Sequence, residues 1–144
     1  IHRPGMLSGH SVTGLGNPAF FPDRYIRGCL QMGCAAASDA VCDLTPVDYA
    51  AKVIADVFHG SSDDDLAQGR TFHIFNPNSP TYTALAGALG LPSLPWKQFL
   101  DHMGPANVLA PLLPVLRSGL PAARAWGDDN LRRVLGALYA PPVE

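Results

Sequence analysis

The sequence predicts a mostly α-helical fold with two or three short strands, and three observations support this. Several segments of about ten residues place apolar side chains at helical spacing. The stretches that suit strands are short: Ile1 to Arg3, Ala40 to Leu44 and Arg70 to Phe75. Fourteen prolines and fourteen glycines among 144 residues predict many turns between short elements rather than a long helical bundle.

Composition limits the classes of function. A chain of 144 residues fits one domain with a modest core. Hydrophobic residues make up 47% and the net charge is -2, so neither sign of charge dominates. We therefore expect no nucleic-acid partner and no membrane span, which needs roughly 20 successive apolar residues. Cys29, Cys34 and Cys42 lack the spacing of a zinc site and favour a reduced, cytoplasmic protein with no bound metal.

The chain opens on a strand-like segment followed by a turn. We expect Ile1 to Arg3 to be the end of a strand whose earlier part lies upstream, because Pro4 and Gly5 force a turn directly after it. On this interpretation the sequence is a fragment. Gly5 to Ala19 predicts an irregular loop with a short extended piece at Ser11 to Thr13.

An amphipathic helix is predicted over Pro22 to Met32. Proline suits the first turn of a helix, and Gly33 is placed to end it. Its apolar face is expected to contain Tyr25, Ile26, Cys29, Leu30 and Met32. Arg24 and Arg27 lie on another face.

Next come a short strand and a second helix. Ala40 to Leu44 is short and apolar, as in a strand. Thr45 then suits an N-cap, Pro46 the first helical position and Asp48 the first turn of a helix that runs to about Phe58. We expect this helix to bury Val47, Ala50, Ala51, Ile54, Val57 and Phe58.

The remainder alternates turns with small helices. Ser61 to Gly69 predicts an acidic exposed loop, and Asn76 to Pro80 a turn after the strand at Arg70 to Phe75. The predicted helices are Thr81 to Leu89, closed by Gly90, then Pro95 to Met103, Val108 to Arg117 and Asp128 to Leu138.

Three motifs in this order carry a resemblance to a known family. They are Arg3-Pro4-Gly5 with Ser8-Gly9, Thr13-Gly14 and Asn17, then Asp43-Leu44-Thr45-Pro46-Val47-Asp48-Tyr49, then Phe72-His73-Ile74-Phe75-Asn76-Pro77. The pattern resembles the extended short-chain dehydrogenase/reductases. Within them it is most similar to the thioester reductase domains that end nonribosomal peptide and polyketide synthetases, and to carboxylic acid and aminoadipate reductases.

The resemblance implies an α/β parent with an NAD(P)-binding Rossmann half, of which residues 1–144 form the C-terminal substrate-binding subdomain. The implied reaction is the NADPH-dependent reduction of a thioester on the phosphopantetheine arm of a carrier protein, which releases an aldehyde or alcohol. The implied partners are that carrier protein and the Rossmann half of the same polypeptide.

The catalytic residues that the family uses are expected upstream. That family uses a Ser or Thr, a Tyr and a Lys four residues after the Tyr. This chain has two lysines, Lys52 and Lys97, and the residues four positions before them are Asp48 and Ser93. We therefore expect no catalytic residue in this chain and no activity from it alone. Gly14-Leu15-Gly16 fits a phosphate-loop pattern only superficially, since no buried strand precedes it.

The remaining candidates are contact residues. The resemblance places Pro4, Gly5 and Met6 beside the nicotinamide, against the alternative of a simple turn after a strand. Ser8, His10, Ser11 and Thr13 are candidates for the cofactor or acyl channel, against ordinary hydrogen bonding within a loop. His10 stands where the family often has an aspartate. Arg24 and Arg27 suit a phosphate or an acidic carrier surface, against a solvated helix face.

Two other functions remain open. One is the same subdomain of a stand-alone extended dehydrogenase or epimerase that acts on a nucleotide sugar. The other is a non-catalytic module that docks a carrier or partner chain.

Overall fold

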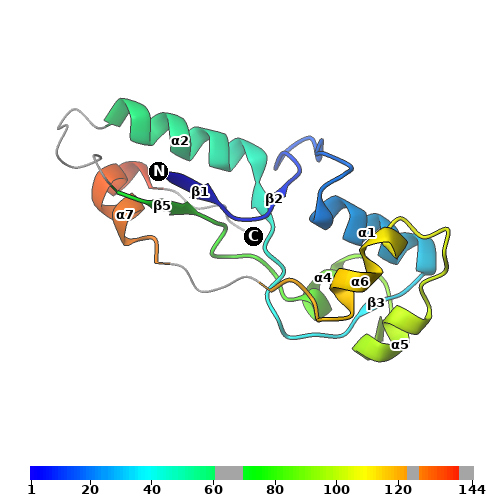
Figure 1. Cartoon of the computed structure of the whole chain (residues 1–144). Coiled ribbons are helices and arrows are strands. Elements are labelled where there is room, and N and C mark those ends of the chain that lie inside the picture. Colours follow the sequence, from blue (N-terminus) through cyan, green and yellow to red (C-terminus); the bar gives the residue numbers. More distant parts are fainter. Residues whose placement is uncertain (61–69, 123–126, 140–144) are drawn as a thin grey trace. The chain divides into compact units, whose positions relative to one another are not determined.

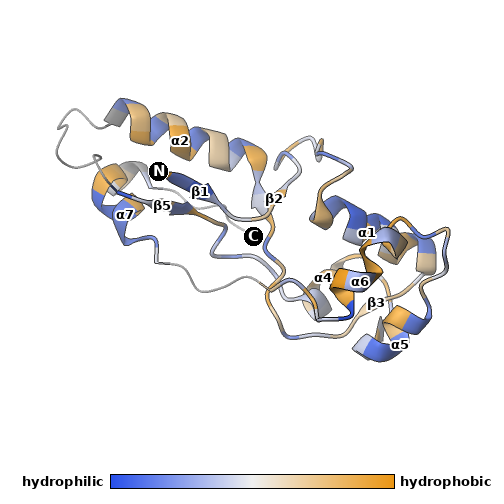
Figure 2. Cartoon of the chain, viewed as in Figure 1, coloured by the Kyte–Doolittle hydropathy of each residue, from blue (hydrophilic) through white to orange (hydrophobic). Residues whose placement is uncertain are grey.

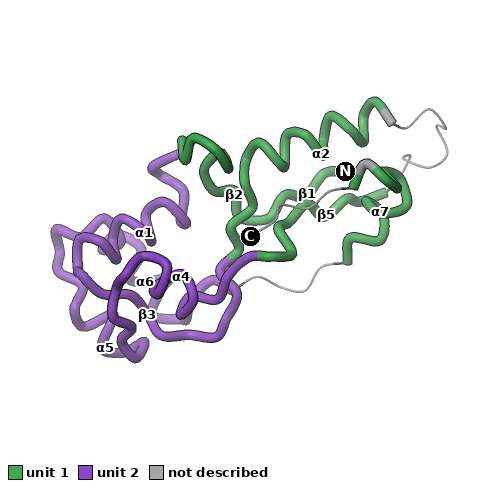
Figure 3. The backbone as a smooth tube through the Cα atoms, turned by 180° about the vertical axis from the view of Figure 1, so that it is seen from behind, with its two compact units in different colours: residues 1–16, 43–78, 124–144 green, residues 17–42, 79–123 purple. Residues whose placement is uncertain are grey.

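A computed structural model describes residues 1–60, 70–122 and 127–139. The chain forms two compact units, and each is described by itself (Figure 3). Unit 1 contains Ile1–Gly16, Asp43–Asn78 and Arg124–Glu144, and unit 2 contains Asn17–Cys42 and Ser79–Ala123.

The elements are short (Figure 1). Unit 1 holds β1 (His2–Pro4), β2 (Leu7–Ser8), β4 (Thr45–Pro46), α2 (Val47–Gly60), β5 (Phe72–Ile74), α7 (Asp129–Leu135) and the 3-10 helix η2 (Gly136–Leu138). Unit 2 holds α1 (Phe21–Met32), β3 (Ala35–Ala36), α4 (Tyr82–Ala88), β6 (Ser93–Leu94), α5 (Trp96–Asp101), the 3-10 helix η1 (Ala110–Leu112) and α6 (Leu113–Leu116). The predicted class, helices with a few short strands, is confirmed.

The described strands pair two by two, and every pair is parallel. In unit 1, β1 pairs with β5, so that Arg3 lies opposite His73, and β2 pairs with β4. In unit 2, β3 pairs with β6. Parallel pairing brings the carboxyl ends of β1 and β5 to the same edge, where Pro4 and Ile74 are register partners.

Unit 1 has a core between β5, α2 and α7. Its buried members are Tyr49, Ala50, Val53, Val57, Phe72, Ile74, Leu131 and Leu135. The predictions for Ala50 and Val57 are confirmed. The predictions for Val47, Ala51, Ile54 and Phe58 are wrong, because α2 turns the side with Tyr49 and Val53 toward β5. As a result α2 keeps a second apolar side exposed, and Figure 2 shows apolar residues along the whole helix.

Unit 2 is built around aromatic rings. The Tyr25 ring lies 5.0 Å from the Tyr82 ring in an edge arrangement and 6.0 Å from the Phe99 ring. The Tyr25 hydroxyl accepts a hydrogen bond from the Ala36 amide at 3.2 Å, which ties α1 to β3. Cys29, Cys34 and Cys42 are buried and free, as expected of small hydrophobic side chains. The face predicted for α1 is confirmed at Tyr25 and Cys29 and wrong at Leu30, which is 54% exposed.

Helix boundaries follow the predicted signals in three places. Pro22 lies in the first turn of α1, and Gly33 ends it with φ of 68°, a left-handed conformation that suits glycine. The Thr81 side chain caps α4 by accepting from the Ala84 amide at 3.1 Å. The helix predicted at Pro95 to Met103 is α5.

Other local predictions need correction. Ser11 to Thr13 forms a turn instead of an extended piece. Ala40 to Leu44 forms no strand beyond one bridge from Val41 to Thr81, and its neighbours Thr45–Pro46 pair with β2 instead. Thr45 therefore lies in a strand and is not the N-cap of α2. Its hydroxyl forms hydrogen bonds with Asp43 and Asn76 instead.

The last third is more broken than predicted. Val108 to Arg117 is divided into η1 and the four-residue helix α6, since Pro111 and Pro114 interrupt the backbone hydrogen bonds. The helix predicted at Asp128 to Leu138 is α7 followed by η2. The loop predicted at residues 61–69 lies outside the described residues. Among the described helices, none has the length and apolar content to cross a membrane.

Candidate functional site

The turn after β1 is held by backbone and side-chain hydrogen bonds. The Gly5 amide donates to the Ile74 carbonyl oxygen at 2.7 Å, which extends the β1–β5 pairing by one residue. The Met6 amide donates to Asp43 Oδ2 at 2.8 Å. Asp43 is only 8% exposed. The turn therefore lies directly against a buried carboxylate.

That carboxylate belongs to a network that joins the three motifs of the sequence. Thr45 Oγ1 donates to Asp43 Oδ1 at 2.7 Å and accepts from the Asn76 amide at 3.0 Å. Asn76 Nδ2 donates to the Leu44 carbonyl oxygen at 3.2 Å. Thr45 is fully buried, so its hydroxyl satisfies both neighbours in a place that water does not reach. The sequence separates these motifs by tens of residues, and the fold places them in one cluster.

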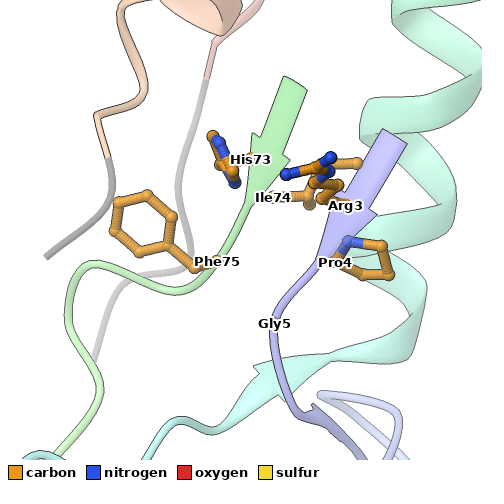
Figure 4. A pocket seen from close by; sticks show the side chains of 6 residues that line it. All are labelled: Arg3, Pro4, Gly5, His73, Ile74 and Phe75. Carbon is orange, nitrogen blue, oxygen red and sulfur yellow. The ribbon is translucent and has the colours of Figure 1, made fainter. Parts of the chain in front are cut away.

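A pocket of about 310 Å³ opens at the carboxyl ends of β1 and β5 (Figure 4). Its lining consists of Arg3, Pro4, Gly5, His73, Ile74 and Phe75. His73 and Phe75 project to the same side of β5. In sheets of parallel strands, ligands bind at the carboxyl ends, so this edge is the best candidate site of unit 1.

The candidate residues Ser8, His10, Ser11 and Thr13 are also in unit 1, on the segment that follows this turn. Ser8 ends β2 and lies opposite Pro46 in register. Thr13 Oγ1 accepts from the Leu15 amide at 3.4 Å, a contact within the loop.

His10 and Ser11 are held against the first turn of α2. The Ser11 amide and hydroxyl donate to the two carboxylate oxygens of Asp48, at 2.9 and 2.6 Å. His10 Nδ1 accepts from the Val12 amide at 3.1 Å and lies 4.0 Å from Asp48 Oδ2. Within the loop, the Gly14 amide donates a hydrogen bond to the His10 carbonyl oxygen at 2.8 Å. This anchor holds the loop and leaves the His10 side chain 42% exposed.

The anchor predicts a response to acid. The hydrogen bonds from the Ser11 hydroxyl and amide hold the pKa of Asp48 below its ordinary value of 3.8. A depressed pKa contributes stability above the unfolded-state value, and this contribution is lost as pH falls through the folded-state value. We expect the Ser11 amide resonance to titrate with a midpoint below 3.8, measured by NMR.

Ser11→Ala serves as the control, because it removes the hydroxyl donor and keeps the amide. Its midpoint should move upward, toward the ordinary aspartate value. An unchanged midpoint in Ser11→Ala would show that the Ser11 hydroxyl does not hold this carboxylate.

Arg24 and Arg27 lie in unit 2, where they line a pocket of about 220 Å³. Pro18, Val108 and Pro111 form its apolar walls. Arg24, which is half-buried, and Arg27, which is exposed, lie on neighbouring turns of α1 and both line this pocket. Two cationic groups beside an apolar wall suit an anion attached to an aliphatic group.

In the part of the chain that the structure describes, the other reactive side chains give no sign of a metal site or of a reactive Cys29. No group of three or more His, Cys, Asp or Glu residues in the described part of the chain has the arrangement to hold a metal ion. Burial raises the pKa of the Cys29 thiol to about 12. A thiol with so high a pKa is a poor nucleophile at neutral pH.

The sequence alone did not predict the network or pocket roles of five residues. Asp43, Thr45 and Asn76 form the network, and His73 and Phe75 line the pocket. All five lie in the second and third motifs, so the available signal was the joint occurrence of these motifs with Arg3-Pro4-Gly5. The carboxylate and the amide have no spacing rule that identifies them locally.

A family model and a solved structure match this chain. A family model described as "Male sterility protein", an NAD-binding family, matches residues 1–54. The crystal structure of the terminal R domain from the myxalamid PKS-NRPS biosynthetic pathway is similar over 99% of this chain and 39% of that chain, with a TM-score of 0.82 and 29% identity. The chain is a relative of the terminal reductase domains.

Two curated proteins are also similar to this chain. The aldehyde reductase lnaA of Aspergillus flavus is 34% identical over 136 residues, which cover 83% of this chain and 13% of that protein. The non-canonical nonribosomal peptide synthetase hkm10 of Aspergillus hancockii is 30% identical over 128 residues, which cover 81% of this chain and 12% of that protein. The chain thus spans a small part of these relatives and under half of the solved terminal reductase domain.

Proposed function

We propose that this chain is the C-terminal substrate-binding portion of a thioester reductase domain that uses NADPH. The complete domain would reduce an acyl or peptidyl thioester on a carrier protein to an aldehyde or alcohol. The observation that carries the proposal is the convergence of the three motifs on one buried network behind the Pro4–Gly5–Met6 turn. Its pocket lies where parallel sheets bind ligands.

Two features of unit 1 support a larger domain. Parallel sheets are normally buried among further strands and helices, yet all three residues of β1 are exposed. A helix with apolar residues on more than one side is normally buried as well. Exposed Val47, Ile54 and Phe58 lie on the second apolar side of α2, and Phe58 is 77% exposed. The proposed Rossmann half would cover both surfaces.

The residues present fit one end of the cofactor. The pocket has the small residues Pro4 and Gly5 at the end of one strand, and His73, Ile74 and Phe75 at the end of the other, so that backbone, apolar and aromatic surface is available to a flat ring. A nicotinamide nucleotide bound there supplies the hydride for the reduction. Gly14 to Gly16 lie in an irregular loop, with no strand leading directly into a helix there. We therefore assign the phosphate-binding residues of the cofactor, as well as the catalytic Ser or Thr, Tyr and Lys, to the proposed upstream half.

The substrate residues are proposed from both units. Ser8, His10, Ser11 and Thr13 are proposed to line the cofactor or acyl-phosphopantetheine channel. Arg24 and Arg27, with their apolar pocket walls, are the proposed contact for the phosphate of the phosphopantetheine arm or the acidic surface of its carrier. The protein that contains them is proposed to be cytoplasmic.

The direct test uses the full polypeptide in which this chain lies. We expect it to oxidise NADPH when given a carrier protein loaded with an acyl thioester, and to release the aldehyde or alcohol, detected by mass spectrometry. Residues 1–144 alone should do neither. Arg24→Ala with Arg27→Ala should raise the KM for the loaded carrier about tenfold or more, which corresponds to the loss of at least one charge-assisted contact.

A matched double variant, Arg117→Ala with Arg133→Ala, removes the same charge from exposed positions outside that pocket and should leave KM unchanged. Turnover of a nucleotide sugar instead of the thioester would favour the stand-alone dehydrogenase. Carrier binding without NADPH oxidation would favour the docking module.

A further inference from the structure

The buried carboxylate of Asp43 lies directly behind the proposed cofactor-facing turn. A Cβ atom added to Gly5 would lie 2.2 Å from Asp43 Oδ2, so the two residues are in close contact. We propose that the negative charge of Asp43 favours the oxidised, positively charged nicotinamide ring over the reduced, neutral ring. This inference rests on the proposed function, since it takes the Pro4–Gly5–Met6 turn as the contact to that ring.

The hydrogen bonds describe an ionised group. Both oxygens of Asp43 act as acceptors, from the Met6 amide and from the Thr45 hydroxyl, as in a carboxylate without a proton. None of the ion pairs within residues 1–60, 70–122 and 127–139 involves Asp43. Asp43 therefore accepts from two donors and has no ion-pair partner among the described residues, while Arg3 supplies a cation on the wall of the adjoining pocket.

A role limited to holding the turn would not need this charge. Burying a charge costs free energy, and a neutral side chain with matching hydrogen bonds avoids that cost. Asp43 is 8% exposed, so water screens its charge less than that of a surface carboxylate, and its field reaches through the turn toward the pocket. A fixed negative charge in that place stabilises positive charge on a ligand at the pocket wall.

The consequence for hydride transfer follows from charge balance. When a hydride with its two electrons leaves the reduced ring for a thioester carbonyl carbon, the ring becomes a cation and the carbonyl oxygen gains the negative charge. Asp43 is on the side of the ring in this arrangement and acts through space, while its hydrogen bonds to Met6 and Thr45 fix its distance. Asp43 therefore acts on the ring through the electric field of its charge. It forms no bond with the cofactor or the substrate.

The test measures cofactor binding without substrate, in the full polypeptide. Asp43→Asn keeps the shape and removes the charge. We expect the ratio of the Kd for NADP⁺ to the Kd for NADPH to rise on the order of tenfold, because only the positively charged ring loses the attraction of the Asp43 charge. This factor suits two charges that interact across a protein segment of moderate dielectric constant. Isothermal titration calorimetry gives both constants, so the readout is independent of turnover.

Two further variants separate charge from shape. Asp101→Asn removes an exposed charge in unit 2 and should leave the ratio unchanged. Thr45→Val breaks the network and keeps the Asp43 charge, so it should weaken both cofactors by a similar factor. If Asp43→Asn fails to fold, as judged by circular dichroism, Leu44→Lys replaces it: a cation beside Asp43 should shift the ratio in the same direction by a smaller factor.

The outcomes distinguish the two proposals. A wild-type polypeptide that binds neither NADP⁺ nor NADPH overturns the proposed function and this inference with it. Wild-type binding with an unchanged ratio in the folded charge variant overturns the inference alone and leaves Asp43 as a support of the turn. A raised ratio confined to the variants that change the charge at this position supports it.

Discussion

Gly5→Ala is expected to destabilise unit 1 by about 2 to 4 kcal/mol. The new methyl group would lie 2.2 Å from Oδ2 and 3.0 Å from Cγ of Asp43, well inside contact distance. Asp43 has little freedom to withdraw, because it is buried and both its oxygens accept hydrogen bonds. Either the turn moves away from Ile74 or the carboxylate leaves Met6 and Thr45, and each change breaks buried hydrogen bonds.

The effect can be measured by urea unfolding followed by NMR through the Ile74 methyl signals, since Ile74 lies in the core of unit 1. Gly104→Ala is a matched control, because its added Cβ meets nothing within 4 Å. The control should keep wild-type stability within about 0.5 kcal/mol. If Gly5→Ala unfolds at the wild-type urea concentration, the close approach of this turn to Asp43 is refuted.

In the full polypeptide, Gly5→Ala should also weaken NADPH binding under the proposed function, because the displaced turn forms the pocket wall. Loss of stability without any change in NADPH binding would separate the fold from the proposed site.

The helix ends and the motifs could be predicted because their signals are local. Proline in a first turn and glycine in a left-handed conformation define α1, and α4 ends before Gly90, which also has a positive φ, as predicted. The resemblance was also readable, since it depends on short motifs in order. These features need no knowledge of what packs against them.

The strands and the buried faces depended on partners distant in the sequence. Two-residue strands such as Ala35–Ala36 and Ser93–Leu94 have too little pattern to be recognised, and they exist because they pair with each other. The second helix is apolar on two sides, so its periodicity fits both, and only the position of β5 selects the side with Tyr49 and Val53. Thr45 has a capping residue's sequence context, but its hydroxyl bonds to Asp43 and Asn76.

The candidate site divides in the same way. Pro4 and Gly5 were selected from their motif and line the pocket. Asp43 was read only as part of a motif, because a carboxylate that accepts from an amide 37 positions earlier leaves no trace in local sequence. The buried position of this charge behind the turn, on which the electrostatic proposal depends, is thus visible only in the folded chain.

Gly28→Ala is the second large effect, and it concerns unit 2. Gly28 is buried in the middle of α1, where alanine is normally the better helix former by about 1 kcal/mol. Here its Cβ would lie 2.6 Å from Leu109 Cδ1 and 2.9 Å from Asn107 Oδ1. Leu109 is fully buried, and Asn107 donates to the Gly28 carbonyl oxygen at 3.0 Å and accepts from the Leu109 amide at 2.8 Å.

Overpacking therefore outweighs helix propensity, and we expect Gly28→Ala to lose about 1 to 3 kcal/mol. The reporter is Trp96, which stacks on Phe99 at 5.5 Å in the same unit. Its fluorescence is followed during urea unfolding in a Trp126→Phe background.

Gly87→Ala is the matched control. Gly87 is also inside a helix, but its added Cβ meets nothing within 4 Å, so only the higher helix propensity of alanine acts and stability should rise slightly. Equal gains in both variants would mean that α1 does not pack closely on the segment at Asn107 and Leu109. A loss confined to Gly28→Ala would show that this segment, despite its irregular backbone, is fixed against α1 beside Arg24 and Arg27.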